Sequence, residues 1–81
     1  MKRDMEIVRM LLLQEESGEE QPELKQFEEL LLVYNIALMV DAGLVEAIIV
    51  PDANGAPVSG AIIRLTWAGH DFLDSSRDET I

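Results

Sequence analysis

The segment Asp41-Ala42-Gly43-Leu44-Val45 decides the fold, because it joins a strongly apolar helix directly to the first strand of a hairpin. Before it, apolar residues at helical spacing predict a helix over residues 28–42, and Gly43 is the residue type expected just beyond a helix end. After it, two segments rich in β-branched residues predict strands at residues 44–50 and 58–65.

The turn of this hairpin lies in Pro51-Asp52-Ala53-Asn54-Gly55-Ala56-Pro57, which contains the dipeptide Asn54-Gly55. Asn-Gly is typical of hairpin turns, because both residues tolerate the left-handed backbone conformation. The two prolines have no N–H to donate to a sheet, so they mark the ends of the strands.

Before the middle helix, the apolar spacing predicts a first helix over residues 4–16, with Asp4 as its N-cap. Clustered charge with Gly and Pro then predicts a solvated acidic loop over residues 17–22. The stretch after this loop has two interpretations. Either the middle helix begins early, around Glu23, or residues 24–26 form a short strand.

The end of the chain predicts a last helix over residues 67–77, with Thr66 as its N-cap. Phe72 and Leu73 fall on the face that would pack against the hairpin. Gly69 lies on the same side, where the missing side chain allows close approach.

The order helix, helix, hairpin, helix is that of a winged helix. The sequence therefore predicts an α+β fold: one small winged-helix (winged helix-turn-helix-like) domain over residues 1–81, with helices plus a two- or three-stranded antiparallel wing. In such domains the helix before the hairpin is normally the one that reads DNA.

Composition limits the classes of function. The 81 residues carry a net charge of −10 and contain no Cys and one His, so disulfides, thiolate metal sites and multi-His sites within one chain are excluded. Nearly half of the residues are apolar, at 48%, which favours self-association in so small a domain. No signal peptide is expected, because acidic residues directly follow the basic start, and the longest apolar stretch is too short for a membrane span. We therefore expect a cytoplasmic protein that does not bind membranes.

Several segments resemble known families. Asp41-Ala42-Gly43-Leu44-Val45 is similar to the "EAGLV" that ends the recognition helix of many bacterial winged-helix regulators, and Leu65-Thr66 with Gly69 is similar to their "LTxxG". A closer resemblance is to domain of unknown function family 2513. The segments that carry it are Met1-Lys2-Arg3-Asp4-Met5, Tyr34, Gly43-Leu44-Val45-Glu46-Ala47, Arg64-Leu65-Thr66-Trp67-Ala68-Gly69-His70-Asp71-Phe72-Leu73-Asp74 and Arg77-Asp78. This resemblance covers the whole chain and implies a winged-helix-like protein of bacteria and their prophages; it implies no known activity.

The middle helix departs from the family pattern, in which polar residues, with His and Lys near the centre, interrupt the apolar ones. From Leu30 to Ala42, eleven of thirteen residues are apolar. A helix that is apolar on all sides is normally covered on all sides, so we expect a second protein chain to cover part of it. The predicted protein interface, most simply that of a homodimer, comprises Leu30, Leu31, Val33, Ala37 and Val40.

DNA binding is disfavoured by charge. Phosphate contacts need Lys or Arg, whereas the segment Gln14–Leu30 holds seven Glu and one Lys. The candidate nucleic-acid contacts are Arg3, Arg9, Asn35 and Arg64, of which Asn35 is the one polar base-reading candidate on the middle helix.

No catalytic, cofactor or metal site is predicted. His70 and Asp74 are four residues apart on one helix face, but two ligands do not make a typical zinc site, and a surface His with a local hydrogen bond is the simpler interpretation. For Trp67 we expect packing in the core or an interface. We expect no enzymatic activity, because no nucleophile, metal cluster or cofactor motif is present.

The preferred hypothesis is a phage- or prophage-type protein-interaction or assembly module that forms a homodimer. The alternatives are a DNA-binding transcriptional regulator and, from the charge of −10, an acidic decoy of a host nucleic-acid-binding protein.

Overall fold

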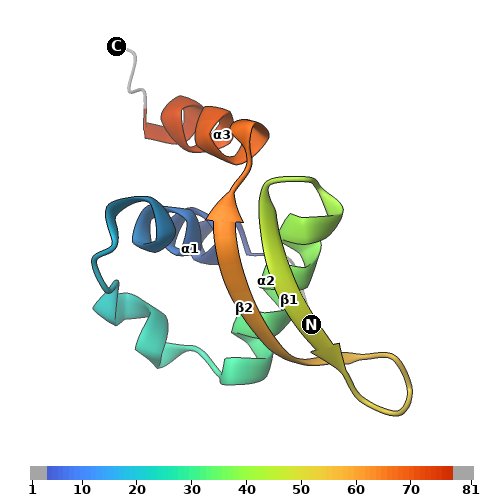
Figure 1. The fold of residues 1–81 in the computed structure, drawn as a ribbon. Helices are drawn as coiled ribbons and strands as arrows, with labels where there is room; N and C mark the ends of the chain where they lie inside the picture. Colours follow the sequence, from blue (N-terminus) through green and yellow to red (C-terminus); the bar gives the residue numbers. More distant parts are fainter. Residues whose placement is uncertain (1–3, 78–81) are drawn as a thin grey trace.

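The computed structural model describes residues 4–77 and has the α+β, winged-helix-like fold that the sequence predicts (Figure 1). Within these residues, three α-helices, one 3-10 helix and a two-stranded antiparallel sheet follow one another along the chain. Their order is α1 (Met5–Ser17), η1 (Pro22–Gln26), α2 (Glu29–Asp41), β1 (Val45–Pro51), β2 (Pro57–Leu65) and α3 (Trp67–Arg77). The α-helices and strands begin and end within one residue of the expected positions, whereas the stretch before α2 is neither a strand nor part of α2 but the separate helix η1.

The N-terminus of α1 is held by polar groups from two parts of the chain. The Asp4 carboxylate accepts hydrogen bonds from the N–H groups of Glu6 and Ile7, which confirms Asp4 as the N-cap. The Asp4 N–H itself donates to Oδ1 of Asn35 on α2, at 2.9 Å, and the Asn35 Nδ2 donates to the Leu31 carbonyl, also at 2.9 Å. Asn35 is fully buried, so it fixes the start of α1 against the middle of α2.

The join between α2 and β1 depends on Gly43. Its φ angle is +78°, in the left-handed region that glycine adopts without strain. The N–H groups of Gly43 and Leu44 donate to the carbonyls of Val40 and Met39, at 2.9 Å each, and close the helix end in a Schellman motif. The chain therefore reverses within the three residues between α2 and β1, and β1 runs back along the helix that precedes it.

The sheet lies over α2, which packs against both strands (Figure 1). The strands pair from Val45 with Leu65 at one end to Pro51 with Pro57 at the other, so the two prolines mark the strand ends as expected. In the turn, Oδ1 of Asp52 accepts hydrogen bonds from the N–H groups of Asn54 and Ala56, at 2.8 and 3.0 Å.

Helix α3 packs closely where β2 ends. The Thr66 hydroxyl accepts from the Gly69 N–H, at 3.1 Å, and donates to the Gly43 carbonyl, so this N-cap also ties α3 to the start of the hairpin. A Cβ atom at Gly69 would lie 2.0 Å from the carbonyl oxygen of Leu44, which confirms that this glycine permits close approach. Leu73 is fully buried in the core.

The hydrophobic core lies between α1, α2 and the inner face of the sheet. Its buried apolar residues are Ile7, Val8, Met10, Leu11, Leu12, Leu24, Val33, Ile36, Met39, Val45, Leu65 and Leu73. Each of the six elements supplies at least one of them, so the core joins segments that are far apart in the sequence.

Candidate protein-binding surfaces

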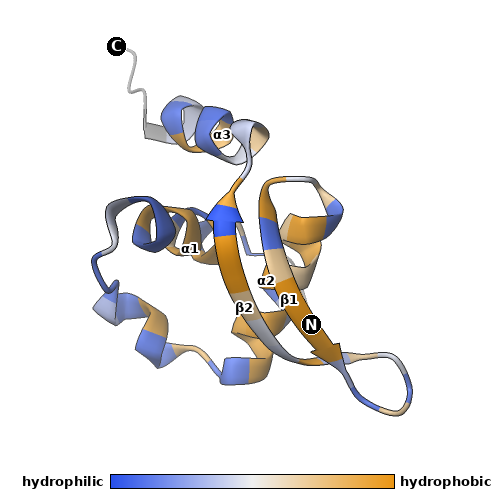
Figure 2. Cartoon of the chain, viewed as in Figure 1, coloured by the Kyte–Doolittle hydropathy of each residue, from blue (hydrophilic) through white to orange (hydrophobic). Residues whose placement is uncertain are grey.

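One face of the hairpin is apolar and lies in solvent. In both strands the residues alternate between the core and the outside, as in any sheet with one covered face. The outward positions of such a sheet are normally polar. Here they include Ile48, Val50, Ala61 and Ile63, which together with Glu46, Ser59 and Arg64 form what we call the outer wing face. Figure 2 shows how apolar the two strands are along their length.

The large apolar side chains of the outer wing face are well exposed. Ile48 is 60% exposed, Ile63 is 55% and Val50 is 48%. A β-bulge contributes to this exposure, because Glu46 pairs with Arg64 while the next residue, Ala47, pairs with Ile62. Ile63 is therefore the extra residue of β2, and it turns outward beside Arg64.

The charges on the outer wing face cancel. Arg64 binds Glu46 through two parallel hydrogen bonds, from Nε to Oε1 at 3.1 Å and from Nη2 to Oε2 at 2.7 Å. Both side chains remain more than half exposed, so this pair contributes at most about 1 kcal/mol to folding. The pair matters more for the charge of the surface than for stability. It leaves the outer wing face without net charge on a strongly acidic protein.

Trp67 lies two residues beyond the end of β2 and is 88% exposed. Of the two expected environments for Trp67, the core is therefore wrong, and packing in an interface stays a prediction. The cause is its place in the first turn of α3, where the inward positions are taken by Gly69 and Leu73. A large, nearly fully exposed Trp is the residue type enriched at the energetic centre of protein interfaces.

The predicted interface residues of α2 differ in how exposed they are. Val33 is 3% exposed and belongs to the core, so the expectation that it meets a second chain is wrong. Leu31 and Ala37 are half-buried against the rest of the chain, and Leu30 and Val40 are exposed near opposite ends of the helix. The sheet and α1 cover most of α2, which accounts for the apolar residues on its buried faces. That Leu30 and Val40 meet a second chain stays a prediction. The missed signal was the β-branched residues at outward positions of the hairpin.

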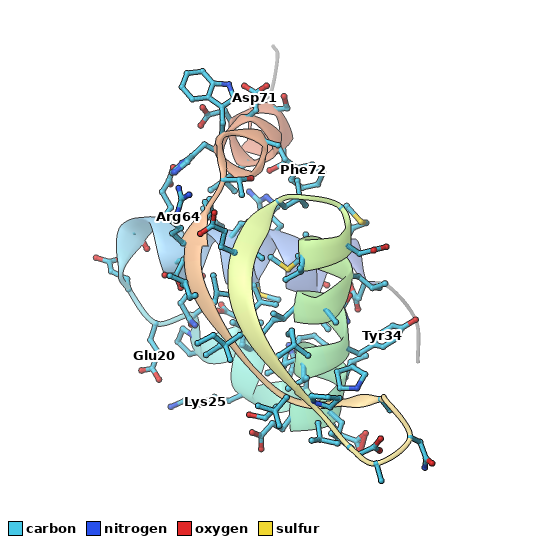
Figure 3. The ribbon with its side chains drawn as sticks, turned by 45° about the vertical axis from the view of Figure 1, so that its right-hand side comes forward. Glu20, Lys25, Tyr34, Arg64, Asp71 and Phe72 are labelled. Carbon is cyan, nitrogen blue, oxygen red and sulfur yellow. The ribbon has the colours of Figure 1, made fainter. Side chains whose placement is uncertain are left out.

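The predicted nucleic-acid contacts do not form one site. Asn35 has no exposed surface and uses its amide within the chain, so this candidate for base reading is excluded. Arg9 is exposed on α1, Arg64 is paired with Glu46 on the wing, and Arg3 lies outside the described residues. Figure 3 shows Arg64 on the side of the molecule where β2 meets α3.

His70 on α3 lies close to the end of α1. Its Nδ1 lies 3.8 Å from Oε2 of Glu16 at the end of α1. In residues 4–77, no three His, Asp or Glu side chains converge in a way that would hold a metal ion.

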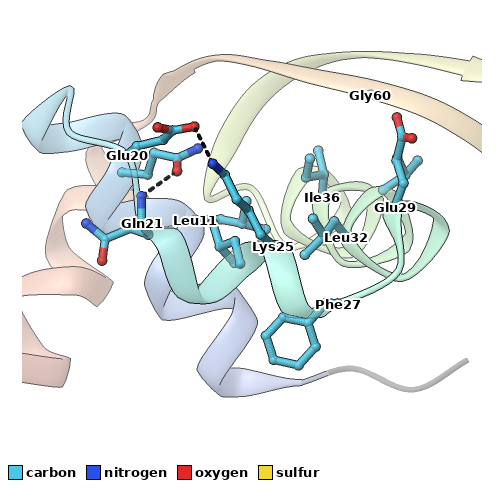
Figure 4. Close-up of a pocket in the computed structure, with 12 residues that line it drawn as sticks. Leu11, Glu20, Gln21, Lys25, Phe27, Glu29, Leu32, Ile36 and Gly60 are labelled. Atoms are coloured by element: carbon cyan, nitrogen blue, oxygen red, sulfur yellow. Dashed lines mark hydrogen bonds and ion pairs between the residues drawn. The ribbon is translucent and has the colours of Figure 1, made fainter.

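A groove lies between α1, η1 and the start of α2, with a volume of about 350 Å³ (Figure 4). Apolar side chains form its floor and walls, and its rim is polar. The lining residues are Leu11, Gln14, Glu20, Gln21, Leu24, Lys25, Phe27, Glu29, Leu32, Val33, Ile36 and Gly60. None of them belongs to the outer wing face, so the two surfaces are separate.

Comparison with protein families identifies the family of this chain. The family model described as "Hypothetical protein (DUF2513)" matches residues 2–81. This chain belongs to the DUF2513 family. A protein of Haemophilus influenzae, strain Rd, described as "Uncharacterized protein", is 35% identical over 88 aligned residues, which cover all of this chain and 72% of that protein. The family resemblance expected from the sequence is therefore confirmed.

No solved structure is significantly similar to this DUF2513 chain. Among the residues that the structure describes, no helix has the length and apolar character to cross a membrane.

Proposed function

We propose that this DUF2513 protein is a protein-interaction module that assembles as a homodimer through its outer wing face. The observation that carries the proposal is the exposure of Ile48, Val50 and Ile63 side by side on a sheet face that no other element of the described chain covers. Contiguous exposed apolar surface on a small protein marks an interaction site more often than it marks free surface.

Charge favours a second copy at this face. Two chains with a net charge of −10 repel each other over most of their surfaces. The outer wing face is the exception, because its one acidic and one basic side chain neutralise each other as a pair. Two copies related by a two-fold axis would bring neutral, apolar surfaces together while keeping the acidic segments around Glu15–Glu29 apart.

The size of the face indicates a weak dimer. Seven residues of β1 span roughly 24 Å at 3.4 Å per residue, and the sheet is two strands wide. An interface built on this ribbon falls at the small, transient end of the range, below about 1,200 Å² in total. We therefore expect a dissociation constant in the micromolar range and a folded monomer at high dilution.

Sedimentation equilibrium over a range of concentrations tests this proposal with Ile48→Asp. Burying the exposed 60% of Ile48 contributes about 1–2 kcal/mol per copy, and the residue occurs twice in a symmetric dimer. We expect the substitution to weaken the dimer at least about thirtyfold.

The matched control is Leu30→Asp on α2, which adds the same charge at a similarly exposed site, 47% for Leu30. This variant should dimerise as the unmodified chain does. A strictly monomeric unmodified chain at high micromolar concentration would refute dimerisation. If Leu30→Asp abolished the dimer and Ile48→Asp did not, the interface would lie on α2 instead.

Duplex DNA fits the described surface poorly as a ligand. The helix that would read bases has its one amide buried, and the wing arginine is neutralised by Glu46. A gel shift with duplex DNA at low salt, where phosphate contacts are strongest, should show no complex with the described fold.

A further inference from the structure

We propose that the groove between η1 and α2 is a second docking site, which takes a segment of another protein that carries a large apolar side chain next to Lys or Arg. The groove shares no residue with the outer wing face, so this inference does not depend on dimerisation. It extends the proposed function from self-assembly to the binding of a partner of defined chemistry.

The floor of the groove is built to receive an apolar group. Leu11 from α1, Leu24 from η1, and Leu32 and Ile36 from α2 supply apolar side chains to its lining, together with Phe27. Its volume of about 350 Å³ is within the usual range of ligand sites, which begins near 300 Å³.

Gly60 helps to keep the groove open. It lies in the interior of β2, where glycine weakens a strand and often marks a place that something approaches closely. A Cβ atom there would lie 3.0 Å from Cδ1 of Ile49 and 3.7 Å from side-chain atoms of Ile36 and Val33. Any larger residue at this position would therefore project toward the groove floor.

The electrostatics of the rim select a cationic partner. Of the charged residues that line the groove, two are acidic, Glu20 and Glu29, and one is basic, Lys25. They belong to the segment Gln14–Leu30, which holds seven Glu and one Lys. In residues 4–77, no basic side chain pairs with Glu29 on the rim. A second copy of this chain is not complementary here, because it has the same acidic character.

Among the residues that the structure describes, Lys25 is the one cation that lines the groove, and its ion pair with Glu20 is weak. Figure 4 shows its side chain extending over the groove toward Glu20, and the two charged groups lie 3.9 Å apart. Both side chains are 74% exposed, so water and salt screen the attraction. An incoming Arg or Lys can therefore replace Lys25 at Glu20 while its apolar neighbour enters the groove.

Nuclear magnetic resonance titration of the full chain tests the proposal. The probe is a short synthetic peptide in which one Trp is flanked by Arg residues, and the comparison peptide has Glu in place of each Arg. The Arg peptide should shift the amide signals of Leu24, Lys25 and Gly60, and the Glu peptide should leave them unchanged.

Two substitutions give a matched pair for the same titration. Glu29→Lys reverses a charge on the rim, whereas Glu28→Lys makes the same change one residue earlier, at a side chain that neither lines the groove nor makes a cap hydrogen bond. At physiological salt, charges beyond about 8 Å are screened. Glu29→Lys should therefore lower the affinity for the Arg peptide roughly fivefold, and Glu28→Lys should lower it much less. Phe27→Ala should also lower the affinity for the Arg peptide, and circular dichroism checks that this variant is folded.

Three results would overturn the proposal. They are peptide-induced shifts that cluster outside the groove, equal binding of the Arg and Glu peptides, and equal effects of Glu28→Lys and Glu29→Lys. Each can occur whether or not the chain dimerises, so a failure here is distinct from a failure of the proposed function.

Discussion

Replacement of Asn35 by Ala should destabilise the protein strongly, because this side chain links two helices inside the core. Its Oδ1 is the acceptor for the N–H of Asp4, and its Nδ2 donates to the Leu31 carbonyl, each at 2.9 Å. Asn35 is fully buried, and in the described structure every buried side-chain polar atom has a partner. The substitution therefore removes two hydrogen bonds and leaves the Asp4 N–H without its acceptor.

The magnitude follows from these contacts. A buried donor left unsatisfied costs about 1–3 kcal/mol, and the second hydrogen bond adds about 1 kcal/mol. We expect a total loss of about 2–4 kcal/mol in the free energy of unfolding. For a domain of this size, 1 kcal/mol lowers Tm by about 4–8 °C, so the variant should melt at least about 10 °C lower.

The assay is urea unfolding followed by far-ultraviolet circular dichroism, at a concentration low enough to keep the chain monomeric. Trp67 fluorescence is unsuited, since this side chain is already 88% exposed in the folded state. The matched control is Asn54→Ala in the exposed hairpin turn, which should change stability by less than about 0.5 kcal/mol. A loss below about 1 kcal/mol for Asn35→Ala would refute the reasoning.

Four further outcomes follow from particular contacts. Gly69→Ala should cost at least about 1–3 kcal/mol in urea unfolding, because the new Cβ would lie 2.0 Å from the Leu44 carbonyl oxygen and α3 would have to move; an unchanged midpoint would contradict the close packing. Asp4→Ala should cost about 1 kcal/mol in the same assay through loss of the N-cap, and no loss would show that solvent replaces it. Arg64→Ala should change the free energy of unfolding by less than about 1 kcal/mol, since its ion pair is exposed; a larger loss would mean that the pair is shielded. Acrylamide should quench Trp67 in the dilute folded monomer nearly as well as it quenches free indole, and protection under those conditions would contradict its exposure.

Local sequence signals predicted the elements well because their ends are decided by local hydrogen bonds. Asp4 and Thr66 cap the helices that follow them through their own side chains, and Gly43 ends α2 through its own backbone angle. The hairpin turn likewise depends on Asp52 and the residues directly after it. None of these interactions needs a distant part of the chain. The exception is the hydrogen bond that the Thr66 hydroxyl donates to the Gly43 carbonyl.

Burial was predicted less well, since it depends on which segments meet. Trp67 was expected in the core or an interface, and the structure excludes the core, because the inward positions of α3 belong to other residues. Asn35 was considered as a base-reading residue and is a buried link between helices. The helix η1 was missed because a single buried residue, Leu24, anchors it, which leaves too short a pattern for periodicity to detect.

The sequence by itself determined the order and ends of the α-helices and strands, the winged-helix-like fold and the DUF2513 membership, because spacing, caps and turn residues are local properties. The tertiary structure alone decided which apolar residues remain exposed. It covered most of the apolar helix α2 with the sheet and α1, and left Ile48 and Ile63 in solvent on the opposite face of that sheet. The physical reason is that a two-stranded sheet has two faces, and the helices of this small chain pack on one of them.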